Sequence, residues 1–328
     1  MRRLLEASYR HAVSATDPGR LVRSHLPDER PAMVLAVGKA ALPMVAEARE
    51  AYRDVAWLAT PPAGSTNVGA ERDAGRTGPH VLPGSHPLPD ASSVRAAESA
   101  LEAVSRLGAD DLLLVLVSGG GSALWCAPSG LDLEAKRALT LALQRAGADI
   151  HELNVVRRHL SRIKGGRLAA ATGARVLTLA LSDVPGDDLA DIASGPSVPD
   201  PTTFADALAV VRRFDVKAPS ATEHLARGVA GAVAETPKPG GAVAARCSAK
   251  VIGSAGKLLS AAESFWTERG HAVVVLSDSL QGEASELARA HAELVLALRA
   301  GSDPRPAAAR LLPEDGSRNR AVFDRLTG

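Results

Sequence analysis

Leu112-Leu-Leu-Val-Leu-Val117 runs directly into Ser118-Gly-Gly-Gly-Ser122, and this junction is the strongest structural signal in the chain. Six consecutive apolar residues without polar alternation predict a strand that is buried on both faces, as in a parallel sheet covered by helices. The largely apolar runs at 33–37 and 175–181 predict two further strands. We therefore expect an α/β fold with a mostly parallel sheet and helices on both of its faces.

The loop after this strand is a candidate phosphate site. It follows the carboxyl end of the strand, where ligands bind in open α/β sheets, and glycines leave backbone N–H groups uncovered for an anion. A tight turn whose glycines only relieve crowding is the alternative. Leu124 breaks the dinucleotide motif, and the loop lacks the Lys-Ser/Thr pair of a Walker A motif. The candidate residues are Ser118, Gly119, Gly120, Gly121 and Ser122.

The composition of the 328 residues excludes several classes of protein. The length predicts two domains, and a net charge of +1 with nine aromatic residues argues against nucleic-acid binding. No apolar run is long enough for a membrane span, and the first ten residues carry Glu6 and Arg10, unlike a signal peptide. We expect a soluble, cytoplasmic protein.

Lys39 follows the strand predicted at 33–37, after Gly38. Lysine is scarce here, with 7 residues against 31 arginines, so its position is informative. A surface lysine at the start of a helix is the alternative. However, a cation at a helix N-terminus is unfavourable unless an anion joins it, so Lys39 fits a point charge on a transferring phosphoryl group.

A basic segment places five cations and a histidine within residues 157–167. Gly165-Gly166 interrupts the segment, and on a helix Arg157, Ser161 and Lys164 would share one face. A solvated basic surface is the alternative. Beside a sheet edge that already holds a glycine loop and a lysine, Arg157 and Lys164 fit the binding of an anionic nucleotide or a substrate carboxylate.

Acidic residues follow two predicted strands. Asp183 comes after the strand at 175–181 and is a candidate Mg²⁺ ligand or general base. Asp278 stands in the same relation to a strand predicted at 272–276. The three other acids of the 182–202 loop, Asp187, Asp188 and Asp191, fit helix caps or turns equally well.

His86 lies between Ser85 and Pro87 in a segment with three prolines, so we expect it outside regular structure. Two interpretations stay open for it, a turn residue and a substrate contact.

Several motifs follow one another in order along the chain. They are Val37-Gly38-Lys39-Ala40, His86-Pro-x-Pro-Asp90, Ser118-Gly-Gly-Gly-Ser-Ala-Leu124, Asn154-x-Val-Arg-x-His159-Leu-Ser-x-Ile-Lys-Gly-Gly166, Ser182-Asp-Val-x-Gly-Asp187, Ser194-Gly-Pro196 with Asp200-Pro-Thr202, and Asp278-Ser-Leu-x-Gly-Glu283. This set resembles the glycerate 2-kinase family, which is often labelled hydroxypyruvate reductase. The resemblance covers roughly residues 1–295.

The resemblance implies ATP- and Mg²⁺-dependent phosphorylation of D-glycerate at its 2-hydroxyl group, giving 2-phosphoglycerate. It also implies a Rossmann-like N-terminal domain and a smaller C-terminal α/β domain, with the site between them. Lys39 carries over as the catalytic lysine. By chemical inference, Asp183 is a second catalytic residue and the metal ligand, and the Ser118–Ser122 loop binds the nucleotide phosphates. The expected substrate contacts are His86, Arg157, Lys164 and Asp278.

The expected domains are 1–236, the start of a C-terminal α/β domain at 242–300, and an irregular tail at 301–328. Members of the family continue with a second module that contains Gly-Gly-Glu-Thr-Thr and Gly-Gly-Arg-Asn-Gln-Glu. Neither motif occurs here, and Arg318-Asn319 matches only in part. On this ground we expect a weak or inactive kinase.

Two other hypotheses remain. The chain could hold a nucleotide or phosphate without catalysis, or it could be an NAD(P)H-dependent hydroxypyruvate reductase, against which the missing dinucleotide motif counts. The expected partners are D-glycerate and ATP, with no nucleic acid and no membrane, and the chain could form a homodimer.

Overall fold

The computed structural model describes residues 2–65, 80–280, 282–312, 322 and 326. The chain divides into two compact units, one of residues 18–252 and one of residues 1–17 and 253–328. No helix of the described part is long and apolar enough to cross a membrane.

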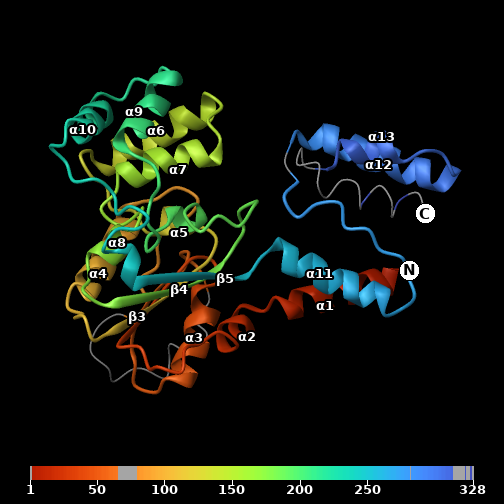
Figure 1. Ribbon diagram of the computed structural model, residues 1–328, viewed down its shortest axis with the longest axis horizontal. Coiled ribbons are helices and arrows are strands. Elements are labelled where there is room, and N and C mark those ends of the chain that lie inside the picture. Colours follow the sequence, from red (N-terminus) through yellow and green to blue (C-terminus); the bar gives the residue numbers. More distant parts are fainter. Residues whose placement is uncertain (1, 66–79, 281, 313–321, 323–325, 327–328) are drawn as a thin grey trace. The chain divides into compact units, whose positions relative to one another are not determined.

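The larger unit is built on a five-stranded sheet with the order β2-β1-β3-β4-β5 (Figure 1). β1 pairs in parallel with β2 and β3, and β3 pairs in parallel with β4. The predicted α/β fold and its parallel sheet are therefore confirmed. The strands are β1 (Met33–Val37), β2 (Ala56–Thr60), β3 (Leu112–Val117), β4 (Arg175–Leu181) and β5 (Cys247–Gly253).

The strand order reverses between β1 and β3, because the chain crosses β1 on its way from β2 to β3. Val37 and Val117 are partners in the register of these two strands. The loops that follow β1 and β3 consequently leave the same edge of the sheet side by side. Such a reversal is where ligands bind in doubly wound sheets.

Helices cover both faces of the sheet, which explains why every residue of β1 and β3 is buried. Alternate side chains of each strand contribute to two different apolar clusters. One cluster includes α4 (Ala91–Val104), α5 (Gly121–Leu124) and α8 (Arg167–Ala170), and the other includes α2 (Pro18–Arg23) and α3 (Ala41–Ala51).

A layer of helices stands beyond the sheet with an apolar core of its own (Figure 1). It contains α6 (Leu133–Arg145), α7 (Ile150–His159), α9 (Phe204–Arg213) and α10 (Pro219–Val229). The first two follow β3 and the last two follow β4, so both crossings from the sheet contribute to this layer. Asp132 and Asp149 side chains cap the first turns of α6 and α7.

The helical face that Arg157, Ser161 and Lys164 would share does not form. α7 ends at His159, and Ser161 instead forms a β-bridge with Pro128. Gly165 and Gly166 have φ angles of 58° and 79°, a left-handed conformation that a continuous helix cannot contain. Arg157 and Lys164 therefore do not share a helical face.

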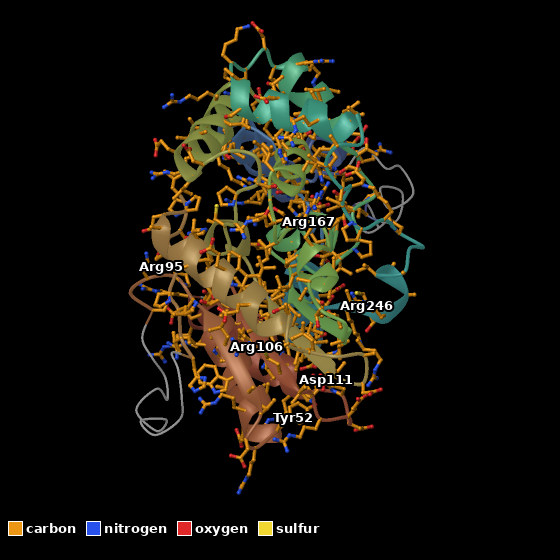
Figure 2. The ribbon with its side chains drawn as sticks, turned by 90° about the vertical axis from the view of Figure 1, so that its left-hand side faces the viewer. Tyr52, Arg95, Arg106, Asp111, Arg167 and Arg246 are labelled. Carbon is orange, nitrogen blue, oxygen red and sulfur yellow. The ribbon has the colours of Figure 1, made fainter. Side chains whose placement is uncertain are left out.

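Residues 242–252, which were expected at the start of the second domain, lie in the larger unit. Arg246, labelled in Figure 2, donates hydrogen bonds to the carbonyl oxygens of Ala169 and Ala174, both at 2.6 Å. These bonds join the entry of β5 to the segment between α8 and β4.

The regular elements that the structure describes after β5 are all helices. α1 (Arg2–Ala15) packs on α11 (Ala255–Thr267), where the rings of His11 and Phe265 lie 5.6 Å apart. The strand predicted at 272–276 does not form, because the described residues that follow 253 offer this apolar run no strand to pair with.

Two more helices of this unit share an apolar cluster, α12 (Ala284–Ala300) and α13 (Arg305–Ala309). α13 lies in the stretch that was expected to be irregular.

Candidate active site

The turns after β1 and β3 are held against each other by hydrogen bonds. The N–H of Lys39 donates to the carbonyl oxygen of Gly119 at 2.9 Å, and the N–H of Ala40 donates to Ser118 Oγ at 3.0 Å. Gly38 has a φ of 121°, and a Cβ at this position would overlap Ser118. Ser118 thus positions the Lys39 turn through its side chain, a role that the sequence pattern did not indicate.

The glycine loop is surrounded by three of the residues that the sequence singled out. A Cβ on Gly119 would overlap the carboxylate of Asp183. A Cβ on Gly120 would lie 3.0 Å from His86 Cδ2 and 3.5 Å from Lys39 Cγ. Only glycine leaves room for these side chains to approach the backbone so closely. The fold therefore brings Lys39, His86 and Asp183 to one loop.

The loop also offers free donors. None of the described residues accepts a hydrogen bond from the N–H of Gly119 or of Gly120. α5, the helix that follows, has only four residues, so a helix dipole contributes little at this point. The affinity of the loop for an anion must come from these N–H groups and from nearby cations.

His86 is influenced by the charges beside it. Burial lowers the pKa of His86, and the positive charge of Lys39 lowers this pKa further, while Asp183 acts in the opposite direction. The imidazole of His86 is consequently neutral near pH 7 and can accept a hydrogen bond.

A strained segment closes the other side of the loop. Ala193 and Ser194 have φ angles of 54° and 60°, which non-glycine residues rarely adopt. A Cβ on Gly121 would lie 2.6 Å from Ala193 Cβ, and Ser194 Oγ lies 2.8 Å from Ser122 Oγ. Strain of this kind persists where the surrounding structure imposes it, often at functional sites.

Asn154 on α7 links this segment to a basic side chain. Its Oδ1 accepts hydrogen bonds from Ser194 Oγ at 2.9 Å and from Arg157 Nη1 at 3.3 Å. Its Nδ2 donates to Asp191 Oδ1 at 3.0 Å. A continuous path of hydrogen bonds thus runs from Ser122 in the glycine loop to the guanidinium of Arg157.

These groups line a cavity of about 740 Å³ between the sheet edge and the helical layer. The sheet edge contributes His86, Gly120, Ser122 and Asp183. The opposite wall comes from α6, α7 and the turns beside them, and its polar residues are Lys136, Arg137, Thr140, Gln144, Asn154, Arg157, Lys164 and Asp191. Arg157 and Lys164 reach the same cavity although they lie on different elements.

Three cations on this wall have no acidic partner among the residues that the structure describes. Lys136 and Lys164 are 6% and 1% exposed, and no described carboxylate forms an ion pair with either of them or with Arg157. Burial lowers the pKa of Lys136 to about 8 and holds that of Lys164 well below its ordinary value. Burial also lowers the pKa of Arg157. We call these three residues the cation cluster.

The residue next to Arg157 shows the opposite arrangement. Arg158 forms ion pairs with Asp191 at 3.1 Å and with Asp200 at 3.0 Å. All three side chains are buried, so these ion pairs lie inside the protein. Asp191 also contacts His151. Asp191 therefore supports the structure rather than capping a helix with its side chain.

No group of three or more His, Cys, Asp or Glu residues in the described part of the chain is arranged to hold a metal ion. Asp183 is a single carboxylate at the glycine loop. This arrangement does not form an all-protein metal cage, but it fits Mg²⁺ carried on a substrate phosphate, which usually takes one or two carboxylates and water.

Asp278 belongs to the smaller unit. Its Oδ2 lies 3.0 Å from the position of a Cβ on Gly256, and it lines a cavity of about 230 Å³ in that unit. Its expected contact with substrate stays a prediction.

Sequence reasoning missed Lys136 and Asn154 as cavity residues. Lys136 is the one lysine of the amphipathic helix α6. Its spacing from the other residues does not distinguish it from an ordinary surface lysine. The scarcity of lysine, which drew attention to Lys39, was the available signal for Lys136 as well.

Comparison with known proteins identifies a family and several similar proteins. A family model described as a domain of unknown function, DUF4147, matches residues 4–226. A protein of Agrobacterium vitis named "Putative hydroxypyruvate reductase" is 41% identical over 303 residues, which are 91% of this chain and 66% of that protein. A D-glycerate 2-kinase of Thermotoga maritima is 36% identical over 85% of this chain and 64% of its own length.

A solved structure shares the fold. The crystal structure of a glycerate kinase from Thermotoga maritima superposes with a TM-score of 0.71 at 33% identity, covering 82% of this chain and 62% of the other. The chain thus spans about two thirds of the length of these relatives.

Proposed function

This chain belongs to the DUF4147 family, and from that premise we propose that it transfers the γ-phosphoryl group of ATP to the 2-hydroxyl group of D-glycerate. One observation carries the proposal. A single cavity joins a glycine loop, with Lys39 and Asp183 against it, to a cluster of cations without acidic partners. The kinase names of two similar proteins support the same assignment.

The glycine loop would bind the phosphates of ATP. The N–H groups of Gly119 and Gly120 would donate to phosphate oxygens, and Lys39 would balance the charge that develops on the transferred group. Because the Lys39 turn is bonded to Ser118 and Gly119, the lysine and the donors would keep a fixed spacing. Such pre-positioning is the main catalytic contribution that a protein makes to phosphoryl transfer.

The opposite wall would bind glycerate. Arg157 and Lys164 would hold its carboxylate, and the neutral His86 would accept a hydrogen bond from a hydroxyl group. The 2-hydroxyl oxygen then forms a bond to the γ-phosphorus as the bond to the β-phosphate oxygen breaks, leaving ADP and 2-phosphoglycerate. Asp183 would accept the hydroxyl proton or hold Mg²⁺, which supplies charge neutralisation on the phosphates when bound.

A nicotinamide-dependent reductase fits the geometry less well. A dinucleotide pyrophosphate binds at the N-terminus of a long helix after the glycine loop, and α5 has only four residues. The cytoplasmic location and the homodimer stay predictions.

The test is the release of ADP from ATP and Mg²⁺ in the presence of D-glycerate, with ³¹P NMR to locate the new phosphate. We expect Lys39→Ala to lower kcat by about 100-fold or more, the effect of removing a charge-stabilising group. Lys217→Ala is the matched control, because Lys217 is an exposed lysine paired with Asp215. A chain that binds both substrates but releases no ADP would refute the kinase assignment.

A further inference from the structure

We propose that Lys136 is a specificity-determining residue that completes, with Arg157 and Lys164, a site for the carboxylate of a small hydroxy acid. The inference rests on the proposed function, because it assigns the part of glycerate that this wall of the cavity recognises. It adds a residue that neither the sequence motifs nor the family match singles out.

The three cations converge from separate elements. Lys136 lies on α6, Arg157 lies on α7, and Lys164 lies in the turn after α7. All three line the same cavity. Side chains brought together from three elements, each at a cost in desolvation, indicate a common ligand rather than a local structural contact.

The hydrogen bond that Lys136 donates is not needed to satisfy its acceptor. Its ammonium donates to the carbonyl oxygen of Leu160 at 2.6 Å. The same oxygen already accepts a hydrogen bond from the N–H of Ser129 at 3.2 Å. An ammonium group has three donors, so two remain for a ligand. Lys164 has a similar reserve, with a single donation of 3.4 Å to the carbonyl oxygen of Ala193.

No described carboxylate neutralises the charge of Lys136. The ionisable groups that face it are Cys126, Arg157 and Lys164. The one acid on this wall, Asp191, is already engaged by Arg158. A buried ammonium without a counter-ion is strongly unfavourable, and a carboxylate in the cavity would remove that penalty.

A carboxylate matches these donors in number and charge. Its two oxygens accept up to about four hydrogen bonds, enough for the guanidinium and both ammonium groups. A neutral polyol or an aldehyde offers neither the charge nor this number of acceptors. Lys136 would thus favour hydroxy acids over the corresponding neutral compounds.

Binding would also be coupled to protonation. Burial and the charge of Arg157 hold the pKa of Lys136 at about 8 when the cavity is empty. A bound carboxylate raises this pKa, so the protein takes up protons as glycerate binds at pH 8 to 9. We therefore expect the KM for glycerate to rise as the pH increases above 8.

The experiment compares Lys136→Met with Lys217→Met in the full chain. Isothermal titration calorimetry measures D-glycerate binding without ATP, in two buffers of different ionisation enthalpy, and separately measures ADP binding. We expect Lys136→Met to weaken glycerate binding about tenfold or more, to reduce proton uptake, and to leave ADP binding within about threefold of the parent. Lys136→Arg should restore part of the glycerate affinity, because it restores the charge.

Different failures are distinguishable. Unchanged glycerate affinity in a folded Lys136→Met, or a loss confined to ADP, would overturn the inference even if kinase activity is measured. If Lys136→Met does not fold, Lys136→Gln is measured by the same criteria. If the parent binds D-glycerate with proton uptake but does not phosphorylate it, the kinase proposal fails while the carboxylate site stands.

Discussion

Two adjacent arginines of α7 lie in opposite electrostatic environments. Arg158 is enclosed with Asp191 and Asp200 and forms an ion pair with each of them inside the protein. Arg157 turns to the cavity with Lys136 and Lys164, and no described carboxylate pairs with them. Ion pairing within the protein therefore distinguishes the structural cluster from the candidate binding site, because the protein stabilises the first alone and needs a ligand for the second.

The largest effect is expected from breaking the ion pairs of Arg158. Arg158→Met would leave two buried carboxylates without their cation, which typically costs about 3–5 kcal/mol. We expect a loss of this size in the free energy of unfolding, measured by urea denaturation. Arg157→Met is the matched control and should remain within about 1 kcal/mol of the parent. Equal losses in both variants would contradict the comparison.

The cation cluster should show its imbalance as a pH dependence of stability. The pKa of Lys136 falls from 10.5 to about 8 on folding. Between these values the unfolded chain binds more protons than the folded one, so the free energy of unfolding rises with pH across this window. The penalty is fully present below pH 8 and relieved near pH 10.5. Its size is on the order of 3 kcal/mol.

Lys136→Met isolates this contribution. The variant should be more stable than the parent at pH 7, and the difference should vanish towards pH 10. Urea denaturation of both proteins at four pH values measures it. A difference that does not change with pH would show that Lys136 is not destabilised by its surroundings.

Much of the fold could be predicted because it follows from local patterns. The apolar runs of β1, β3 and β4 allow little else than buried parallel strands, and all three form where expected. β5 was missed because Cys247–Gly253 has polar residues at alternate positions, the pattern of a strand at the edge of a sheet. The 272–276 run has strong β propensity, but a strand also needs a partner.

The candidate site was predictable only in part. Residues that directly follow strands, such as Lys39 and Asp183, must gather at the sheet edge, so their meeting follows from topology. The contrast between Arg157 and Arg158 could not be predicted. It depends on which of the two arginines contacts Asp191 and Asp200, which lie in a distant loop. Lys136 reaches the cavity only because α6 packs beside α7.

The cation cluster is also expected to bind D-glycerate through Arg157. Arg157→Met should raise the KM for D-glycerate by about 10- to 100-fold, the usual range for a hydrogen bond between charged groups. Steady-state kinetics at saturating ATP measures this change. A variant with an unchanged KM and a lower kcat would place Arg157 at the transferred phosphate instead.

The smallest effect is expected at Asn154, which contacts Asp191 of the Arg158 ion pairs and Arg157 of the cation cluster. Its amide donates to Asp191 and accepts from Arg157. Asn154→Asp keeps the shape of the side chain and brings a carboxylate oxygen to Arg157, while the donor to Asp191 is lost and a second carboxylate oxygen takes its place. The protein would then supply part of the anion that the cation cluster lacks. We expect this internal carboxylate to compete with glycerate and to raise its KM by about tenfold.

Asn154→Ala is the control that removes the amide without adding a charge. It should raise the KM less than Asn154→Asp does, because the cluster stays unbalanced. The two variants are compared by steady-state kinetics and by calorimetric titration with D-glycerate. If Asn154→Ala weakens glycerate binding as much as Asn154→Asp, the amide acts by positioning Arg157, and charge balance is not what governs this wall of the cavity.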